Sequence, residues 1–143
     1  MTDNNNPLGV WTLVSMQFVF DDTGERVDVY GAHPDGVIVL TAQGRMIGII
    51  TTGAEAQRAD PDTATLFRNM LAYSGPYRIE GDKFITNVDI AWHPSWVGTE
   101  QVRFFRVEGD RLFITTPPQT LPRYDARLGH AVLEWRRNPV TRR

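Results

Sequence analysis

Leu8-Gly9-Val10-Trp11 opens the first long apolar run of the chain, and Leu133-Glu134-Trp135-Arg136-Arg137 ends the last one. The first and last strands become neighbours when an antiparallel sheet closes on itself, and an arginine of one strand can then cover an indole ring of the other. Because side chains alternate along a strand, Arg137 and Trp135 share a face. The sequence therefore predicts a closed β-barrel whose seam is sealed by Trp11, Trp135 and Arg137.

The composition is that of an ordinary globular domain, with 41% hydrophobic and 22% charged residues in a chain of 143. We expect a single domain over residues 1–143, with a core from about residue 8 to about residue 137. A net charge of −2 gives no electrostatic case for a nucleic-acid partner. Cysteine, a signal peptide and a membrane-spanning apolar stretch are all missing from the sequence, so we expect a cytoplasmic protein with no membrane partner. A homodimer is left open.

Short turn signals separate runs of β-branched and aromatic residues at regular intervals. Glycine stands where a left-handed residue is needed in three predicted hairpins, at Ala42-Gln43-Gly44, Gly81-Asp82 and Gly109-Asp110. The predicted strands cover residues 10–20, 26–30, 37–41, 45–51, 77–80, 84–91, 102–107, 112–115 and 131–137. This pattern predicts a mainly β, antiparallel fold.

One segment breaks the β pattern. Between Pro61 and Tyr73, the apolar residues Leu66, Phe67, Met70 and Leu71 are spaced as on one face of a helix. A proline and acidic residues precede them, as is typical of a helix start. We expect one short amphipathic α-helix that packs on one end or one wall of the barrel.

Four motifs together resemble a known family. They are Gly9-Val10-Trp11, the segment Tyr73-Ser74-Gly75-Pro76-Tyr77, the terminal Trp135-Arg136-Arg137 and the block Trp96-Val97-Gly98-Thr99-Glu100-Gln101-Val102-Arg103, which is the most specific. On these motifs the chain resembles the lipocalin-like domain family of bacteria and fungi, from Leu8 to Arg137. The resemblance implies an antiparallel calycin-type β-barrel with a central pocket. Many relatives carry histidine where this chain has Asn87, so a histidine-based role does not transfer to that position.

The sequence lacks the residue patterns of several kinds of catalytic and binding site. No serine lies in a Gly-x-Ser-x-Gly elbow, and Lys83 follows a turn where its amine is solvated. The three histidines stand far apart without metal-ligand spacing, and no glycine-rich phosphate loop is present. We therefore expect no metal and no cofactor.

Polar side chains of the strand over residues 99–107 could face the barrel interior. Period two puts Gln101, Arg103 and Phe105 on one face of this strand, and we predict that this face is the inner one. A surface position for Arg103, paired with an acid, is the alternative.

The neighbouring strand over residues 84–91 carries two further candidates, Asn87 and Asp89, on one face. We expect Asp89 to face Gln101 or Arg103, whose charge would keep its carboxylate ionised. Asp89 would then be a candidate catalytic base, and a structural ion pair or an exposed strand acid is the alternative.

Aromatic residues are the remaining candidates for the pocket. Tyr73 and Tyr77 share a face of an extended chain, and a buried tyrosine usually finds a hydroxyl partner. Trp96, together with Trp92, is predicted to form an aromatic rim at the barrel mouth. Plain core packing is the alternative for all four. The expected wall residues are Ile38, Leu40, Met46, Gly48, Val88, Phe105 and Ile114.

Three functions are open at this point. The first is binding of a small, mainly apolar molecule in the barrel cavity. The second is a cofactor-independent isomerase, cyclase or lyase for a polyketide- or terpenoid-like substrate, with Tyr77, Arg103 and Asp89 as candidate catalytic residues. The third is a structural subunit with a fully packed barrel. Gly48 and Gly75 are expected to widen any cavity, because they lack side chains.

Overall fold

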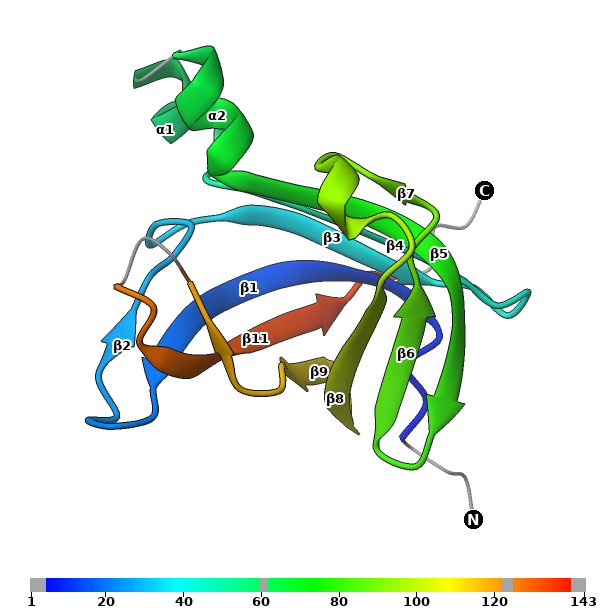
Figure 1. The fold of residues 1–143 in the computed structure, drawn as a ribbon. Helices are drawn as coiled ribbons and strands as arrows, with labels where there is room; N and C mark the ends of the chain where they lie inside the picture. The colour runs from blue at the N-terminus through cyan, green and yellow to red at the C-terminus, as the bar shows by residue number, and fades with distance from the viewer. Residues whose placement is uncertain (1–4, 60–61, 122–124, 140–143) are drawn as a thin grey trace.

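The computed structural model describes residues 5–59, 62–121 and 125–139, and its main feature is a sheet that closes into a barrel (Figure 1). The strands are β1 (Gly9–Phe20), β2 (Arg26–Val27), β3 (Asp35–Leu40), β4 (Arg45–Thr51), β5 (Met70–Glu80), β6 (Lys83–Asn87), β7 (Ile90–Ala91), β8 (Glu100–Glu108), β9 (Arg111–Thr115), β10 (Gln119–Thr120) and β11 (Leu128–Arg137). Eight of them form the closed ring β1-β3-β4-β5-β6-β8-β9-β11, in which every neighbouring pair is antiparallel. The predicted antiparallel barrel is confirmed.

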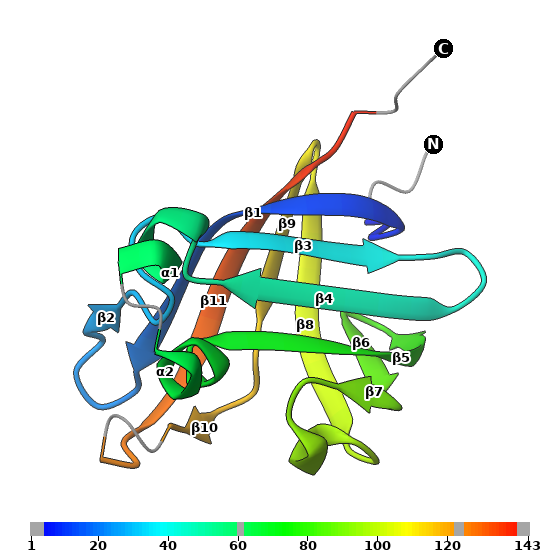
Figure 2. The ribbon, with the colours of Figure 1, turned by 90° about the horizontal axis from the view of Figure 1, so that it is seen from above.

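The interior of the barrel holds the core. Seen from above, β3, β4 and β5 cross the direction of β8 and β9 (Figure 2). Alternate residues of β1, β9 and β11 are buried, which matches the period of two in the sequence. The barrel order therefore brings residues from both ends of the chain into one cluster.

The seam lies between β1 and β11, where Trp11 is paired with Arg137. The Trp11 side chain is fully buried, and the Arg137 guanidinium carbon lies 4.1 Å from the centre of its ring. Arg137 also donates to the carbonyl oxygens of Leu8, at 2.8 Å, and Asn6, at 3.2 Å, while the Trp11 indole N–H donates to Pro7 O at 2.9 Å. The N-terminal segment is thus fastened across this end of the barrel.

The helical segment differs from the prediction. Two short helices, α1 (Ala54–Ala59) and α2 (Thr63–Arg68), take the place of one longer helix, and a 3-10 helix η1 (Pro94–Trp96) lies further along. Met70 and Leu71 belong to β5, because pairing with Thr51 and Ile50 of β4 replaces the helical bonds that their spacing indicates. Pro61, in the first turn of the predicted helix, lies outside the described residues. In the described part of the chain, no helix has the length and apolar character to cross a membrane.

The predicted strand over residues 84–91 is interrupted. β6 ends at Asn87, and β7 pairs with β5 instead of continuing beside β8. Between them the Val88 N–H donates to Thr99 O and the Asp89 N–H donates to Ser74 O. Phe84, Thr86 and Val88 are buried, whereas Asn87 and Asp89, on the opposite face, are exposed.

Candidate functional site

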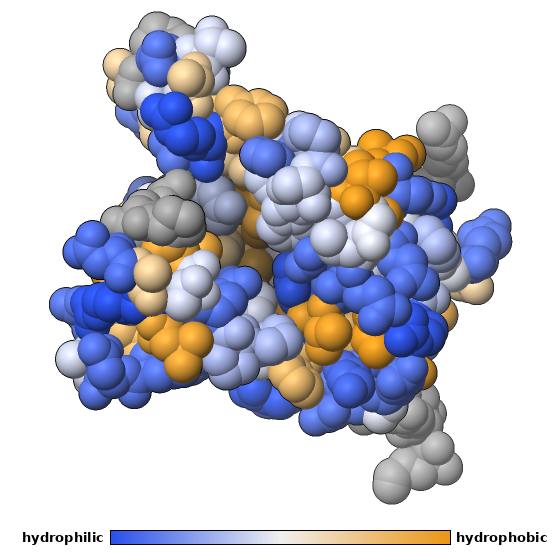
Figure 3. Space-filling model, in the orientation of Figure 1, coloured by the Kyte–Doolittle hydropathy of each residue, from blue (hydrophilic) through white to orange (hydrophobic). Residues whose placement is uncertain are grey.

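The barrel encloses a cavity of about 280 Å³ whose rim includes residues of α2, η1 and β10. On the face seen in Figure 3 a recess opens between the strands, with apolar surface in its depth. The apolar wall residues include Met16, Phe18, Ile38, Met46, Ile50, Leu71, Ile114, Ala131 and Leu133. The interior is therefore not packed solid, and its empty space suits an apolar molecule.

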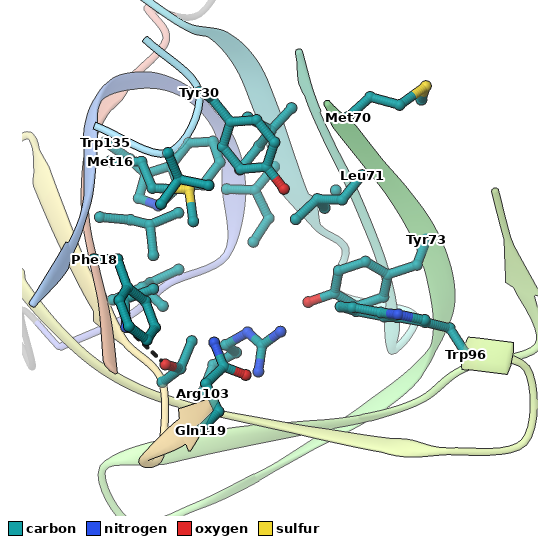
Figure 4. Close-up of a pocket in the computed structure, with 18 of the residues that line it drawn as sticks. Met16, Phe18, Tyr30, Met70, Leu71, Tyr73, Trp96, Arg103, Gln119 and Trp135 are labelled. Carbon is teal, nitrogen blue, oxygen red and sulfur yellow. Dashed lines mark hydrogen bonds between the residues drawn. The ribbon is translucent and has the colours of Figure 1, made fainter. Parts of the chain in front are cut away.

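Arg103 brings a positive charge to this mainly apolar cavity. It lies on the inner face of β8, is half-buried and points toward the enclosed space (Figure 4). Its Nη1 donates to Val102 O at 2.8 Å, its Nη2 donates to Gln101 Oε1 at 3.3 Å, and its guanidinium carbon lies 5.9 Å from the centre of the Tyr73 ring. No carboxylate of the described residues is within ion-pair distance of Arg103. The positive charge of Arg103 is therefore not neutralised by an acidic side chain of the described residues.

The strand that carries Arg103 has the predicted orientation. Phe105 is buried in the core, whereas Phe104 and Arg106 are exposed. Arg106 binds Glu108 on the outer surface. The prediction that Arg103 and Phe105 face inward is correct.

Aromatic side chains surround one side of the cavity mouth. The ring of Tyr73 lies 5.1 Å from that of Trp96, and Trp96 lies 5.0 Å from Trp92. The Trp92 indole N–H donates to Phe67 O at 3.2 Å, which links this cluster to α2. The predicted aromatic rim is thus present, and Trp92, Trp96 and Tyr73 all line the cavity. His93, beside them, is exposed, and its Nδ1 accepts the Ser95 N–H at 3.2 Å.

Five further polar side chains line the cavity: Tyr30, Arg68, Thr116, Gln119 and Trp135. In Figure 4 the hydroxyl groups of Tyr30 and Tyr73 both point toward the enclosed space. Thr116 Oγ1 accepts the Ala131 N–H at 2.9 Å and is part of the sheet. The indole N–H of Trp135 is buried and has no hydrogen-bond acceptor in the described structure. The cavity therefore offers donors at separate places on its wall.

The predicted ligand-binding residues divide into two groups. Those that line the cavity are Tyr73, Trp96, Arg103 and Met46. Those that do not are Leu40, Tyr77, Asn87, Gln101 and Phe105, and the expected wall residue Val88 is also outside the lining. Leu40 and Phe105 are buried in the same cluster as Trp11 and fill the barrel where it is closed, while Asn87 is exposed. Gln101 contacts Arg103 and Thr99 and can only orient the guanidinium.

Tyr77 is a structural residue in this arrangement. Its hydroxyl donates to Thr41 O at 2.8 Å, and its ring meets Phe84 edge-on at 6.4 Å. Burial raises the pKa of the Tyr77 hydroxyl above its ordinary value. Its proton is held by the backbone of a neighbouring turn, which does not suit proton transfer in the cavity.

Asp89 lies on the outer surface in an ion pair, which agrees with the alternative and not with a position beside Gln101 or Arg103. Its carboxylate forms two bonds with the guanidinium of Arg45, at 2.6 and 3.0 Å, and the same guanidinium donates to Ser74 Oγ. The hydrogen bonds from Arg45 hold the pKa of Asp89 below its ordinary value. Asp89 therefore pairs with Arg45 instead of Gln101 or Arg103, because the face of β6 that lies beside Gln101 and Arg103 carries Thr86 and Phe84.

The two glycines expected to widen the cavity have different surroundings. Gly48 lines the cavity, and a Cβ there would meet only the end of Met46, at 3.1 Å, and the Tyr73 ring, at 4.0 Å. Gly75 lies outside the lining, and a Cβ there would be 1.9 Å from Asn87 O. Only Gly48 leaves room for a ligand, and Gly75 allows β5 and the end of β6 to touch.

Several lining residues were missed from the sequence. Met16 and Phe18 alternate inward on β1 and could have been found from their period of two. Tyr30, Gln119 and the other lining residues in loops or two-residue strands have no periodic signal. Their positions depend on the conformations of the loops that connect the barrel strands.

The lining contains no carboxylate and no imidazole among the described residues. Within the same residues, no group of three or more histidine, aspartate or glutamate side chains could hold a metal ion. The cavity can therefore bind through apolar contact, tyrosine hydroxyls and the Arg103 guanidinium.

Comparison with known proteins agrees with the architecture. No curated protein matches the chain. The model of a family described as a lipocalin-like domain matches residues 8–138, a range that contains every strand of the barrel. The seam of Trp11 and Arg137, the central cavity and the block ending at Arg103 all lie within this match. The chain belongs to the lipocalin-like domain family.

Proposed function

We propose that the protein binds a small, mainly apolar molecule that carries one acidic oxygen group, and that Arg103 holds this group. The observation that supports it is a guanidinium in an apolar cavity without a carboxylate partner among the described residues. A charge removed from water needs a partner of opposite sign, and a planar guanidinium matches a carboxylate or an enolate. Arg68, which lines the cavity from α2, adds positive charge near the entrance.

The alternatives are less well supported. A proton-transfer enzyme needs a base in the cavity, and two of its candidates, Tyr77 and Asp89, are engaged by Thr41 and Arg45 elsewhere. A fully packed structural subunit does not fit a cavity of about 280 Å³. Binding is therefore the function that the lining favours.

Isothermal titration calorimetry with straight-chain alkanoic acids and their primary amides tests this function. A charge-assisted hydrogen bond is worth about 1.5–3 kcal/mol, so the acid should bind roughly 10- to 100-fold more tightly than the amide of equal length. Arg103→Gln should abolish this preference. Arg106→Gln is the matched control, because Arg106 is on the same strand but faces outward. Equal affinities of the wild type and Arg103→Gln for the acid would refute the proposal.

A further inference from the structure

The indole N–H of Trp135 is a second donor in the cavity that the function proposed above does not use. The Trp135 side chain is 2% exposed and lines the cavity, and its Nε1 has no acceptor within the described residues. A buried N–H without an acceptor costs roughly 1–3 kcal/mol, so native proteins rarely leave one unpaired. The other buried side-chain atom in this state, Thr86 Oγ1, lies outside the cavity lining.

Trp135 lies much deeper than Arg103. Thr115 of β9 is paired with Phe104 of β8 and with Val132 of β11. The next row toward the cavity mouth therefore consists of Arg103, Thr116 and Ala131. Trp135 is four residues beyond Ala131 on β11, which corresponds to about 13 Å along the strand. Trp135 is therefore displaced from the row of Arg103 toward the end of the barrel where Trp11 is paired with Arg137.

The surroundings of Trp135 decide what can accept its hydrogen bond. Its partners across the sheet are Leu13 and Leu112, and in Figure 4 it lies beside Met16. A buried water molecule normally needs two to four polar partners, and these neighbours offer none. The oxygen of an otherwise apolar ligand needs only the one donor. The site thus fits a ligand atom better than a water molecule.

We infer that the ligand carries a second, neutral acceptor oxygen at its far end, which accepts the hydrogen bond of Trp135 Nε1. The ligand class is then an apolar acid with a ketone, ester or ether oxygen remote from its acidic group. This inference rests on the proposed function, because it takes the acidic group to be bound at Arg103. The apolar body between the two oxygens would contact Ile114 and Leu133, which lie in the row between the two donors.

The first test is an NMR experiment on the full-length wild-type protein with ¹⁵N-labelled indoles. The probes are an alkanoic acid and the acid of equal length with a terminal methyl ketone, compared over a series of lengths. At one length the keto acid should shift the Trp135 Nε1–H resonance downfield, and the plain acid should not. The indoles of Trp11 and Trp92 are controls, because they already donate to Pro7 O and Phe67 O. Trp135→Phe assigns the resonance.

Calorimetry provides the second test. Trp135→Phe removes the donor and keeps an aromatic ring, so it should weaken keto-acid binding about three- to tenfold and leave plain-acid binding unchanged. An unshifted Trp135 resonance at every length, or an equal shift with both acids, would overturn the inference. If the wild type and Arg103→Gln bind the plain acid equally well, the proposed function itself is overturned. If Trp135→Phe does not fold, the wild-type spectra still decide, with assignment by through-space contacts.

Discussion

Replacing Gly75 by alanine is expected to destabilise the barrel strongly, whereas the same replacement at Gly48 is expected to be tolerated. Both glycines lie in neighbouring strands, and neither has the positive φ that would disfavour alanine. The difference is therefore one of space. At Gly75 the new Cβ meets the backbone of Asn87, and at Gly48 it meets the flexible end of Met46.

The size of the stability loss in Gly75→Ala follows from the distance between the new Cβ and Asn87. A Cβ at residue 75 would lie 1.9 Å from Asn87 O and 2.7 Å from Asn87 C, so β5 must move by more than about 1 Å to reach van der Waals distance. That movement stretches the hydrogen bond from Asp89 N to Ser74 O, which is 3.0 Å long. Overpacking costs about 1–3 kcal/mol or more, and a lost hydrogen bond adds about 1 kcal/mol. We expect a loss of at least about 3 kcal/mol in the free energy of unfolding, or roughly 10 °C in Tm.

Gly48→Ala is the matched control. Alanine in a strand is favoured over glycine by about 0.5–1 kcal/mol, which offsets the small displacement of Met46. The free energy of unfolding should thus change by less than about 1 kcal/mol. Urea unfolding followed by tryptophan fluorescence measures both variants. If Gly75→Ala is as stable as the wild type, or if the two variants lose stability equally, the close approach of β5 and β6 is wrong.

Three other variants test the fold and the rejected site residues. Trp11→Ala should lower the free energy of unfolding by about 3–5 kcal/mol, and an unchanged Tm would contradict the sealed seam. Tyr77→Phe should cost about 0.5–1.5 kcal/mol through its lost bond to Thr41 O and leave ligand affinity unchanged, as measured by calorimetry. Asp89→Asn should also leave affinity unchanged. Because the folded-state pKa of Asp89 is lowered, the stabilisation by Arg45 is present above about pH 4 and is lost as the pH falls through that pKa. The urea midpoints of Asp89→Asn and wild type should therefore converge in acid, and a constant difference would count against this pairing.

The barrel was predictable because its signals are local. Gly44, Gly81 and Gly109 have the positive φ values that their hairpin turns require, and alternation fixes which residues of each strand face inward. The length of the helix was misjudged because the apolar spacing from Leu66 to Leu71 is helical throughout, whereas α2 ends at Arg68 and Met70 begins β5. Pairing with β4, which is distant in sequence, decides for the strand. α1 has helix-favouring alanines after Gly53, and this signal was available.

The site was only partly predictable. Arg103 was placed correctly because its strand is regular from Glu100 to Glu108. Asp89 was misplaced because the inner face of β6 is the one that carries Phe84 and Thr86, and Asn87 and Asp89 lie on the opposite face. Tyr77 packs on Phe84 and donates to Thr41 O, outside the cavity lining. Period two predicts which residues share a face of a strand, but which face is the inner one and how far the cavity extends depend on the neighbouring strands.

The two arginines that face the barrel interior have different partners, and this difference predicts different roles. Arg137 uses its guanidinium on Leu8 O, Asn6 O and the face of Trp11, all within the protein. Arg103 has five donors, and within the described residues it donates hydrogen bonds only to Val102 O and Gln101 Oε1, so most of its hydrogen-bonding capacity is open to the cavity. Arg137→Gln should therefore lower the free energy of unfolding by about 2–4 kcal/mol, whereas Arg103→Gln should change it by less than about 1 kcal/mol. Urea unfolding of both variants measures this contrast. A larger loss of stability in Arg103→Gln than in Arg137→Gln would mean that the Arg103 charge supports the fold instead of a ligand.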